Sequence, residues 1–246
     1  MVSNIYNLSN KNVTLTSYIL DSSKEMAHFN KRPAILICPG GAYKFCSDRE
    51  GEPIAMHFLS MGYNVFVLRY SLNENSMFPK PLEDAEEAMQ FILDNANGFN
   101  VDVENIAVCG FSAGGHLAAS LGILGKNKPK AMILGYPCIS ENICNEIDCL
   151  ANKGNLPVLD KLVDVNTPPA FIFLAKDDGT VPINSSLDLE KALKEHGVPC
   201  ELHIFEKGGH GFATGDYVTC QYDGYSKFDT YQWILHCKEW LYKIFR

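Results

Sequence analysis

Residues 105–118 decide the fold, and they read Asn-Ile-Ala-Val-Cys-Gly-Phe-Ser-Ala-Gly-Gly-His-Leu-Ala. Residues 106–109 are apolar, as in a strand buried on both faces, and the stretch from residue 113 onward is rich in Ala and Leu, which favours a helix. Between them, Gly110-Phe111-Ser112-Ala113-Gly114 matches the pattern G-x-S-x-G. In a sharp strand-to-helix turn the serine backbone is strained, and glycines two positions before and after it avoid a clash. The segment therefore predicts Ser112 as a nucleophile at a helix N-terminus, whose partial positive charge favours a developing anion.

Similar apolar runs alternate with helical patterns along the rest of the chain. Buried strands are predicted at 34–38, 64–70, 105–109, 131–136, 170–175 and 201–206, and the period-two pattern of 13–20 indicates an edge strand. Helices are predicted at 51–61, 82–96, 113–124, 185–196 and 230–244. This alternation is typical of an α/β fold with a mainly parallel central sheet and helices on both faces. Catalytic groups on such sheets lie on loops at the carboxyl ends of the strands.

The chain has 246 residues, of which 46% are hydrophobic and 20% charged, so a single domain over 1–246 with a sizeable core is predicted. Residues 138–168 have weak periodicity and predict a small cap insertion over the sheet. The net charge of −8 argues against nucleic acid and against an anionic membrane surface as partners.

The N-terminus lacks the basic and apolar regions of a signal peptide, and no apolar run approaches the roughly 20 residues that cross a bilayer. A cytoplasmic protein is therefore predicted. The nine cysteines include no CxxC pair. They are interpreted as reduced thiols, several of them in the core, and no metal or organic cofactor is expected.

The serine hydroxyl needs a base, because an isolated hydroxyl is a poor nucleophile at neutral pH. His210 is the best candidate, since it follows the last predicted strand and has glycines on both sides. His116 lies one helical turn beyond Ser112 and is interpreted as structural. The base in turn needs an orienting carboxylate, and Asp178, with Asp177 as the alternative, directly follows the strand 170–175.

Pro39-Gly40-Gly41-Ala42-Tyr43 follows the apolar strand 34–38 and is a candidate for binding the oxyanion. Glycines there allow the main chain to approach a substrate closely. The predicted donors are the N–H groups of Gly41 or Ala42 together with that of Ala113. Tyr43 is a candidate for the substrate pocket, although a packed core tyrosine is an equal alternative.

The chain resembles the bacterial α/β-hydrolases of the acetylesterase and acetylxylan-esterase type, often called carbohydrate esterases. The resembling segments span nearly the whole chain and are 39–43, 49–55, 67–70, 81–85, 110–118, 175–182, 184–185, Trp233 and Trp240. Ala42 departs from the family's PGGGY pattern but keeps its N–H. The resemblance implies the second aspartate of the acid loop, Asp178, as the triad member. It also implies hydrolysis of short acyl esters, typically acetyl groups on sugars, and allows a homo-oligomer.

We therefore expect a serine esterase that acts on small-molecule esters through Ser112, His210 and Asp178. Two alternatives remain open at this stage. The first is a small amide hydrolase, such as a formamidase or a peptidase-like enzyme, because a fold alone does not select the leaving group. The second is a non-catalytic ligand-binding module, which would not need three triad members in the order Ser, Asp, His.

Overall fold

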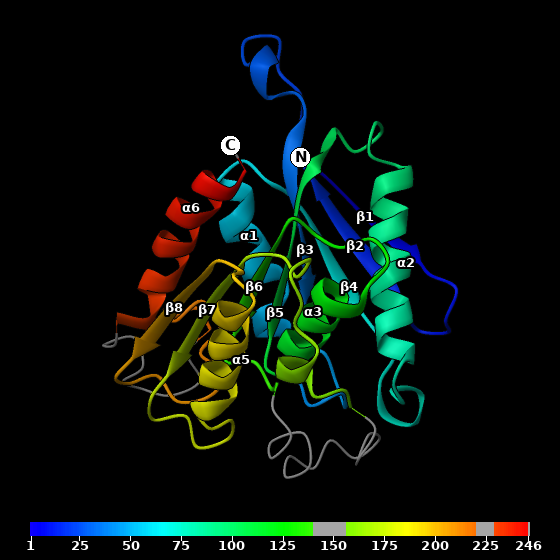
Figure 1. The fold of residues 1–246 in the computed structure, drawn as a ribbon. Coiled ribbons are helices and arrows are strands. Elements are labelled where there is room, and N and C mark those ends of the chain that lie inside the picture. Colours follow the sequence, from blue (N-terminus) through cyan, green and yellow to red (C-terminus); the bar gives the residue numbers. More distant parts are fainter. Residues whose placement is uncertain (140–155, 220–228, 246) are drawn as a thin grey trace.

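The computed structural model describes residues 1–139, 156–219 and 229–245. In these segments the centre is an eight-stranded sheet with the order β1-β2-β4-β3-β5-β6-β7-β8 (Figure 1). The strands are β1 (Val2–Asn7), β2 (Thr14–Ile19), β3 (Arg32–Cys38), β4 (Asn64–Arg69), β5 (Val101–Phe111), β6 (Ala131–Gly135), β7 (Ala170–Ala175) and β8 (Cys200–Phe205). Every pairing from β4 to β8 is parallel, and β2 is antiparallel to both of its neighbours. This confirms the predicted α/β-hydrolase type of fold with a mainly parallel sheet.

The helices cover both faces of the sheet, as predicted (Figure 1). They are α1 (Glu52–Ser60), α2 (Lys80–Asp94), α3 (Ala113–Leu124), α5 (Asn184–Glu195) and α6 (Gln232–Ile244). On one face α1 lies beside α6, where the rings of Phe58 and Trp233 are 6.5 Å apart. On the other face lie α2, α3 and α5. Because nearly every residue of α3 is apolar or small, this helix is buried on all sides at the centre of its layer.

The parallel strands bury both faces, which explains their continuous apolar runs. All residues of β6 and β7 are buried. Trp233 of α6 stacks on Phe173 of β7, with ring centroids 4.1 Å apart. Because β3, β5, β6, β7 and β8 run in the same direction, the loops that follow them meet at one edge of the sheet.

The predicted edge strand at 13–20 is an inner strand, which corrects the sequence-based interpretation. It forms β2, and β1 pairs along its outer side from Val2↔Ile19 to Asn7↔Thr14. No side chain of β1 is buried. β1 is held mainly by backbone pairing, so it lacks the burial pattern that reveals a strand in a sequence.

Most of the predicted cap insertion, 140–155, lies outside the described residues. The described part of 138–168 contains a short 3₁₀ turn, η4 (Leu159–Lys161). Across the described ranges, no helix is long and apolar enough to cross a membrane.

Candidate active site

Ser112 lies at the turn between β5 and α3 with a backbone φ of +52°. A Cβ atom at Gly110 would lie 2.1 Å from the carbonyl oxygen of Gly114, and one at Gly114 would lie 2.1 Å from that of Cys38. Only glycine fits at these positions, so the G-x-S-x-G spacing follows from the close approach of Gly110 to the start of α3 and of Gly114 to the end of β3. The strained turn directs the Ser112 hydroxyl into the loops at the carboxyl edge of the sheet.

The structure brings the three predicted triad residues together in one chain of hydrogen bonds, Ser112–His210–Asp178, which we call the relay. His210 Nε2 lies 2.9 Å from Ser112 Oγ, and His210 Nδ1 lies 2.7 Å from Asp178 Oδ2. The other oxygen of Asp178 accepts N–H bonds from Thr180 and Val181 at 2.8 and 2.9 Å. The side chain of Asp178 is 1% exposed and that of His210 20% exposed. The carboxylate is thus fixed and shielded from water, while the imidazole remains reachable from the cavity.

His116 is not part of this relay. It is fully buried, where its Nε2 lies 3.1 Å from the carbonyl oxygen of Pro157 and its Nδ1 lies 2.9 Å from the hydroxyl of Tyr43. A carbonyl only accepts, so Nε2 carries the proton and Nδ1 accepts from Tyr43. Burial lowers the pKa of His116 to about 4, although the bond to Pro157 opposes this shift. His116 is therefore a neutral structural histidine, as its sequence position suggested.

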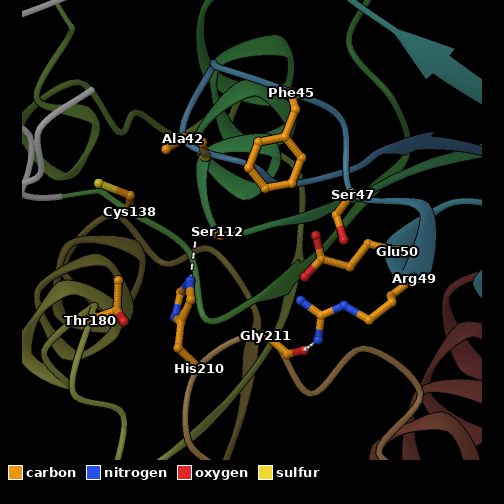
Figure 2. A pocket seen from close by; sticks show the side chains of 12 residues that line it. Ala42, Phe45, Ser47, Arg49, Glu50, Ser112, Cys138, Thr180, His210 and Gly211 are labelled. Atoms are coloured by element: carbon orange, nitrogen blue, oxygen red, sulfur yellow. Dashed lines mark hydrogen bonds between the residues drawn. The ribbon is translucent and has the colours of Figure 1, made fainter. Parts of the chain in front are cut away.

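A cavity of about 200 Å³ opens onto the relay (Figure 2). Its described lining residues are Gly41, Ala42, Phe45, Ser47, Arg49, Glu50, Ser112, Ala113, Cys138, Thr180, His210 and Gly211. Gly41 and Ala42 have φ angles of +128° and +54°. Within the described residues, the N–H groups of Gly41, Ala42 and Ala113 donate no hydrogen bond to protein atoms. These donors beside Ser112 are available to a negatively charged oxygen.

Tyr43 does not lie in the substrate pocket. Of its two sequence-based alternatives, the structure shows the packed core tyrosine. It is 2% exposed, its hydroxyl bonds to His116, and its ring packs against that of Tyr70 at 5.6 Å. It is not among the described residues that line the cavity. The backbone turns at positive φ through Ala42 and Tyr43, which directs the ring into the core. The aromatic residue at the cavity is instead Phe45, which is 58% exposed.

Arg49, Glu50 and Tyr136 also lie at or beside the cavity, and none of them was a site candidate from the sequence. Glu50 and Arg49 line the cavity, and the Tyr136 ring packs against His210 with centroids 5.0 Å apart. Burial raises the pKa of Glu50, while hydrogen bonds from Tyr136 and from the Gly40 N–H oppose that rise. Glu50 lies in a polar segment, Ser-Asp-Arg-Glu-Gly-Glu, where no pattern distinguishes a buried carboxylate from its exposed neighbours.

Two family models match consecutive parts of the chain. The model described as BD-FAE matches residues 20–147, and the model described as the prolyl oligopeptidase family matches residues 150–237. The first match covers the Gly41 turn and Ser112, and the second covers Asp178 and His210.

Individual relatives and a solved structure are also similar to most of the chain. The chain is 33% identical over 211 residues to endo-1,4-beta-xylanase B of Butyrivibrio fibrisolvens and 31% identical over 199 residues to an acetylxylan esterase of Xylanibacter ruminicola. These alignments cover 76% and 74% of the chain but only 33% and 41% of the relatives' own lengths. The crystal structure of MGS-M1, an alpha/beta hydrolase from a Medee basin deep-sea metagenome library, is 41% identical with a TM-score of 0.90, and 98% of both chains is covered.

Proposed function

Because the chain belongs to the BD-FAE family of α/β-hydrolases and carries a carboxylic ester hydrolase domain, we propose that it hydrolyses short-chain acyl esters, chiefly acetyl esters of sugars. The observation that carries this proposal is the relay from Ser112 through His210 to Asp178, with bonds of 2.9 and 2.7 Å. The relay ends in a cavity that also presents unused backbone N–H donors.

In the proposed mechanism, His210 Nε2 takes the hydroxyl proton as Ser112 Oγ attacks the ester carbonyl carbon. The N–H groups of Ala113 and of Gly41 or Ala42 bind the oxyanion. Asp178 stabilises the imidazolium, which then gives its proton to the leaving alcohol as the acyl–oxygen bond breaks. Water attacks the acyl-enzyme with His210 again as base, which releases the acid and restores Ser112.

Two features favour a small acyl group on a sugar. The cavity of about 200 Å³ is at the small end of ligand sites, so a short acyl group fits it better than a long one. The half-exposed ring of Phe45 beside it offers an apolar surface to the C–H face of a sugar ring. The relatives named for xylan and acetylxylan add support from similarity for this class of alcohol.

A small amide hydrolase is the second candidate, and the match of residues 150–237 to the prolyl oligopeptidase family is the observation that favours it. The same relay can attack an amide carbonyl, because the fold does not select the leaving group. The two candidates differ in the leaving group that His210 must protonate.

The test is a side-by-side rate comparison on p-nitrophenyl acetate, butyrate and octanoate, on acetylated xylose, and on an aryl formamide. Ser112→Ala is the control, because it removes the nucleophile and leaves the turn intact. We expect acetate release that falls with chain length, extends to the sugar, and is lost in Ser112→Ala. Activity that survives Ser112→Ala in a folded protein would exclude the mechanism, and faster turnover of the formamide than of every ester would select the second candidate.

A further inference from the structure

Glu50 is a buried carboxylate at the wall of the cavity, at the end of the short 3₁₀ turn η2 (Asp48–Glu50). It is only 3% exposed, and Figure 2 shows its carboxylate turned towards the side of the cavity where Ser112 lies. Oε2 accepts the N–H of Gly40 at 2.8 Å, and Oε1 accepts the hydroxyl of Tyr136 at 2.6 Å. Both oxygens thus act as acceptors, as they do in an ionised carboxylate.

Each partner of Glu50 leads to a part of the catalytic machinery. Gly40 directly precedes the turn whose N–H groups face the cavity. Tyr136 follows β6, its ring packs against His210, and its hydroxyl also accepts the N–H of Ala213 at 3.1 Å. Arg49, the residue before Glu50, strengthens this connection, since its Nη1 donates to the carbonyl oxygen of Gly211 at 2.7 Å.

We propose that Glu50 is a positioning residue for the reaction, an inference that rests on the proposed hydrolase function. Its carboxylate holds the Gly40–Ala42 turn and the loop of His210 in a fixed relation to each other, through Gly40 on one side and Tyr136 on the other. It also places a negative charge near the imidazole, which gains a positive charge when Ser112 attacks.

The hydrogen-bond pattern explains why a carboxylate and not an amide stands here. Two donors, the Gly40 N–H and the Tyr136 O–H, converge on Glu50, and a carboxylate offers an acceptor to each. A glutamine offers one oxygen and one NH₂ group, so one of the two donors loses its acceptor. In a buried site the unpaired donor is costly, and the segment that carries it shifts.

The charge effect has a defined direction. The groups around His210 are Asp178 at Nδ1, Ser112 at Nε2 and the ring of Tyr136, with the carboxylate of Glu50, the guanidinium of Arg49 and the Asp177–Lys207 ion pair beside it. Replacing Glu50 by glutamine removes a negative charge that attracts both the imidazole of His210 and the guanidinium of Arg49. Protonation of the imidazole then becomes harder, so the acid limb of kcat/KM moves to lower pH.

The experiment compares Glu50→Gln, Tyr136→Phe and the double variant with the wild type on p-nitrophenyl acetate. A fluorophosphonate measures how fast Ser112 is modified, independently of ester turnover. Asp84→Asn is the matched control, because Asp84 is also buried and also accepts two donors, Asn10 Nδ2 and the Ser71 N–H, but does not line the cavity. Thermal unfolding of each variant shows that it is folded.

We expect Glu50→Gln to lower kcat about 10- to 100-fold with KM within about threefold, because the turn and the base are misplaced. The acid limb should move down by roughly half a pH unit or more. In the Tyr136→Phe background, Glu50→Gln should lower kcat by less than about fivefold, because one of the two donors to Glu50 is already absent. Asp84→Asn should change stability but leave kcat within about threefold.

Two results would overturn the inference: folded Glu50→Gln with wild-type kcat and phosphonylation rate, or an acid limb that does not move. Phosphonylation separates this inference from the ester proposal. A wild type that is phosphonylated at Ser112 but does not hydrolyse the acetate would refute the ester proposal alone, and the phosphonylation rates of the variants would then decide the role of Glu50.

Discussion

Asp177 and Asp178 are neighbours in the chain, but their carboxylates hold different parts of the His210 loop. Asp178 Oδ2 lies 2.7 Å from the ring nitrogen Nδ1 of His210, whereas Asp177 Oδ1 accepts the backbone N–H of Gly209 at 2.8 Å. Asp177 also lies 3.8 Å from Lys207 Nζ, at the other end of that short loop. One carboxylate therefore orients the imidazole and the other supports its backbone.

The first prediction separates these two roles. Asp178→Asn should lower kcat by roughly three to four orders of magnitude, because an amide at this position favours the wrong imidazole tautomer and cannot stabilise the cation. Asp177→Asn keeps an acceptor for Gly209 and should cost less than about tenfold. Steady-state kinetics on p-nitrophenyl acetate, with circular dichroism to confirm folding, gives both values. A larger loss of kcat for Asp177→Asn than for Asp178→Asn would mean that Asp177, not Asp178, orients the imidazole.

The second prediction concerns the turn beside the nucleophile. A Cβ atom at Gly41 would lie 2.1 Å from the carbonyl oxygen of Phe45, and Gly41 has a φ of +128°. Gly41→Ala should therefore displace the turn and lower kcat by about 100-fold or more, the size of effect expected when an oxyanion donor is lost.

Ala42→Gly is the matched control at the adjacent position. Ala42 already has a φ of +54°, which is strained for a residue with a Cβ atom. Glycine relieves that strain and keeps the N–H, so kcat should stay within about threefold and the free energy of unfolding should rise by up to about 1 kcal/mol. Wild-type kcat in a folded Gly41→Ala variant would show that the turn does not present these donors to the substrate.

The parts of the molecule that sequence reasoning predicted correctly are those in which a local pattern has a direct physical cause. The buried strands are apolar because both faces are covered, and helix α3 begins and ends at the predicted residues, 113 and 124. The meeting of Ser112, Asp178 and His210 in space could be predicted because each residue lies in the turn or loop that follows a strand. The parallel sheet then brings these strand ends to one edge.

The parts that were missed depend on contacts between distant segments. Glu50 and Tyr136 are 86 residues apart in the chain, and nothing in the family-like segment 49–55 or in the predicted strand 131–136 indicates that the two side chains meet. Tyr43 was a candidate for the pocket because it follows the glycine turn, but the positive φ angles at Gly41, Ala42 and Tyr43 direct its ring inward. Backbone reversals of this kind have no periodic signature, so they require the three-dimensional structure.

The third prediction follows from the buried His116. Its pKa falls from 6.5 to about 4 in the fold, so the unfolded chain binds a proton that the folded chain does not bind between these values. Stability from this group is complete above about pH 6.5 and is lost as the pH falls towards 4. One pKa unit corresponds to about 1.4 kcal/mol, so the loss amounts to about 3 kcal/mol.

His116→Gln is the variant that tests whether His116 causes this loss of stability at low pH. Its amide can donate to Pro157 and accept from Tyr43, but it does not titrate. Urea unfolding at pH 7, 5.5 and 4.5 should show a steeper loss of stability in the wild type than in the variant. Parallel curves would mean that other groups cause the acid sensitivity.

The fourth prediction is that the ionised carboxylate of Glu50 lowers the stability of the fold, although it supports catalysis. Burial raises the pKa of Glu50 above its usual 4.5, so the folded chain holds this proton more tightly than the unfolded chain. Stability is therefore lost as the pH rises from about 4.5 through the raised pKa in the fold, the reverse of the usual carboxylate case.

Glu50→Gln removes this pH dependence of stability, and His116 contributes equally to both proteins. The free energy of unfolding of Glu50→Gln minus that of the wild type should increase from pH 4.5 to pH 7.5 in urea titrations, while kcat falls. If instead this difference decreases with pH, the Glu50 carboxylate stabilises the fold and the expected conflict between stability and activity at this site is refuted.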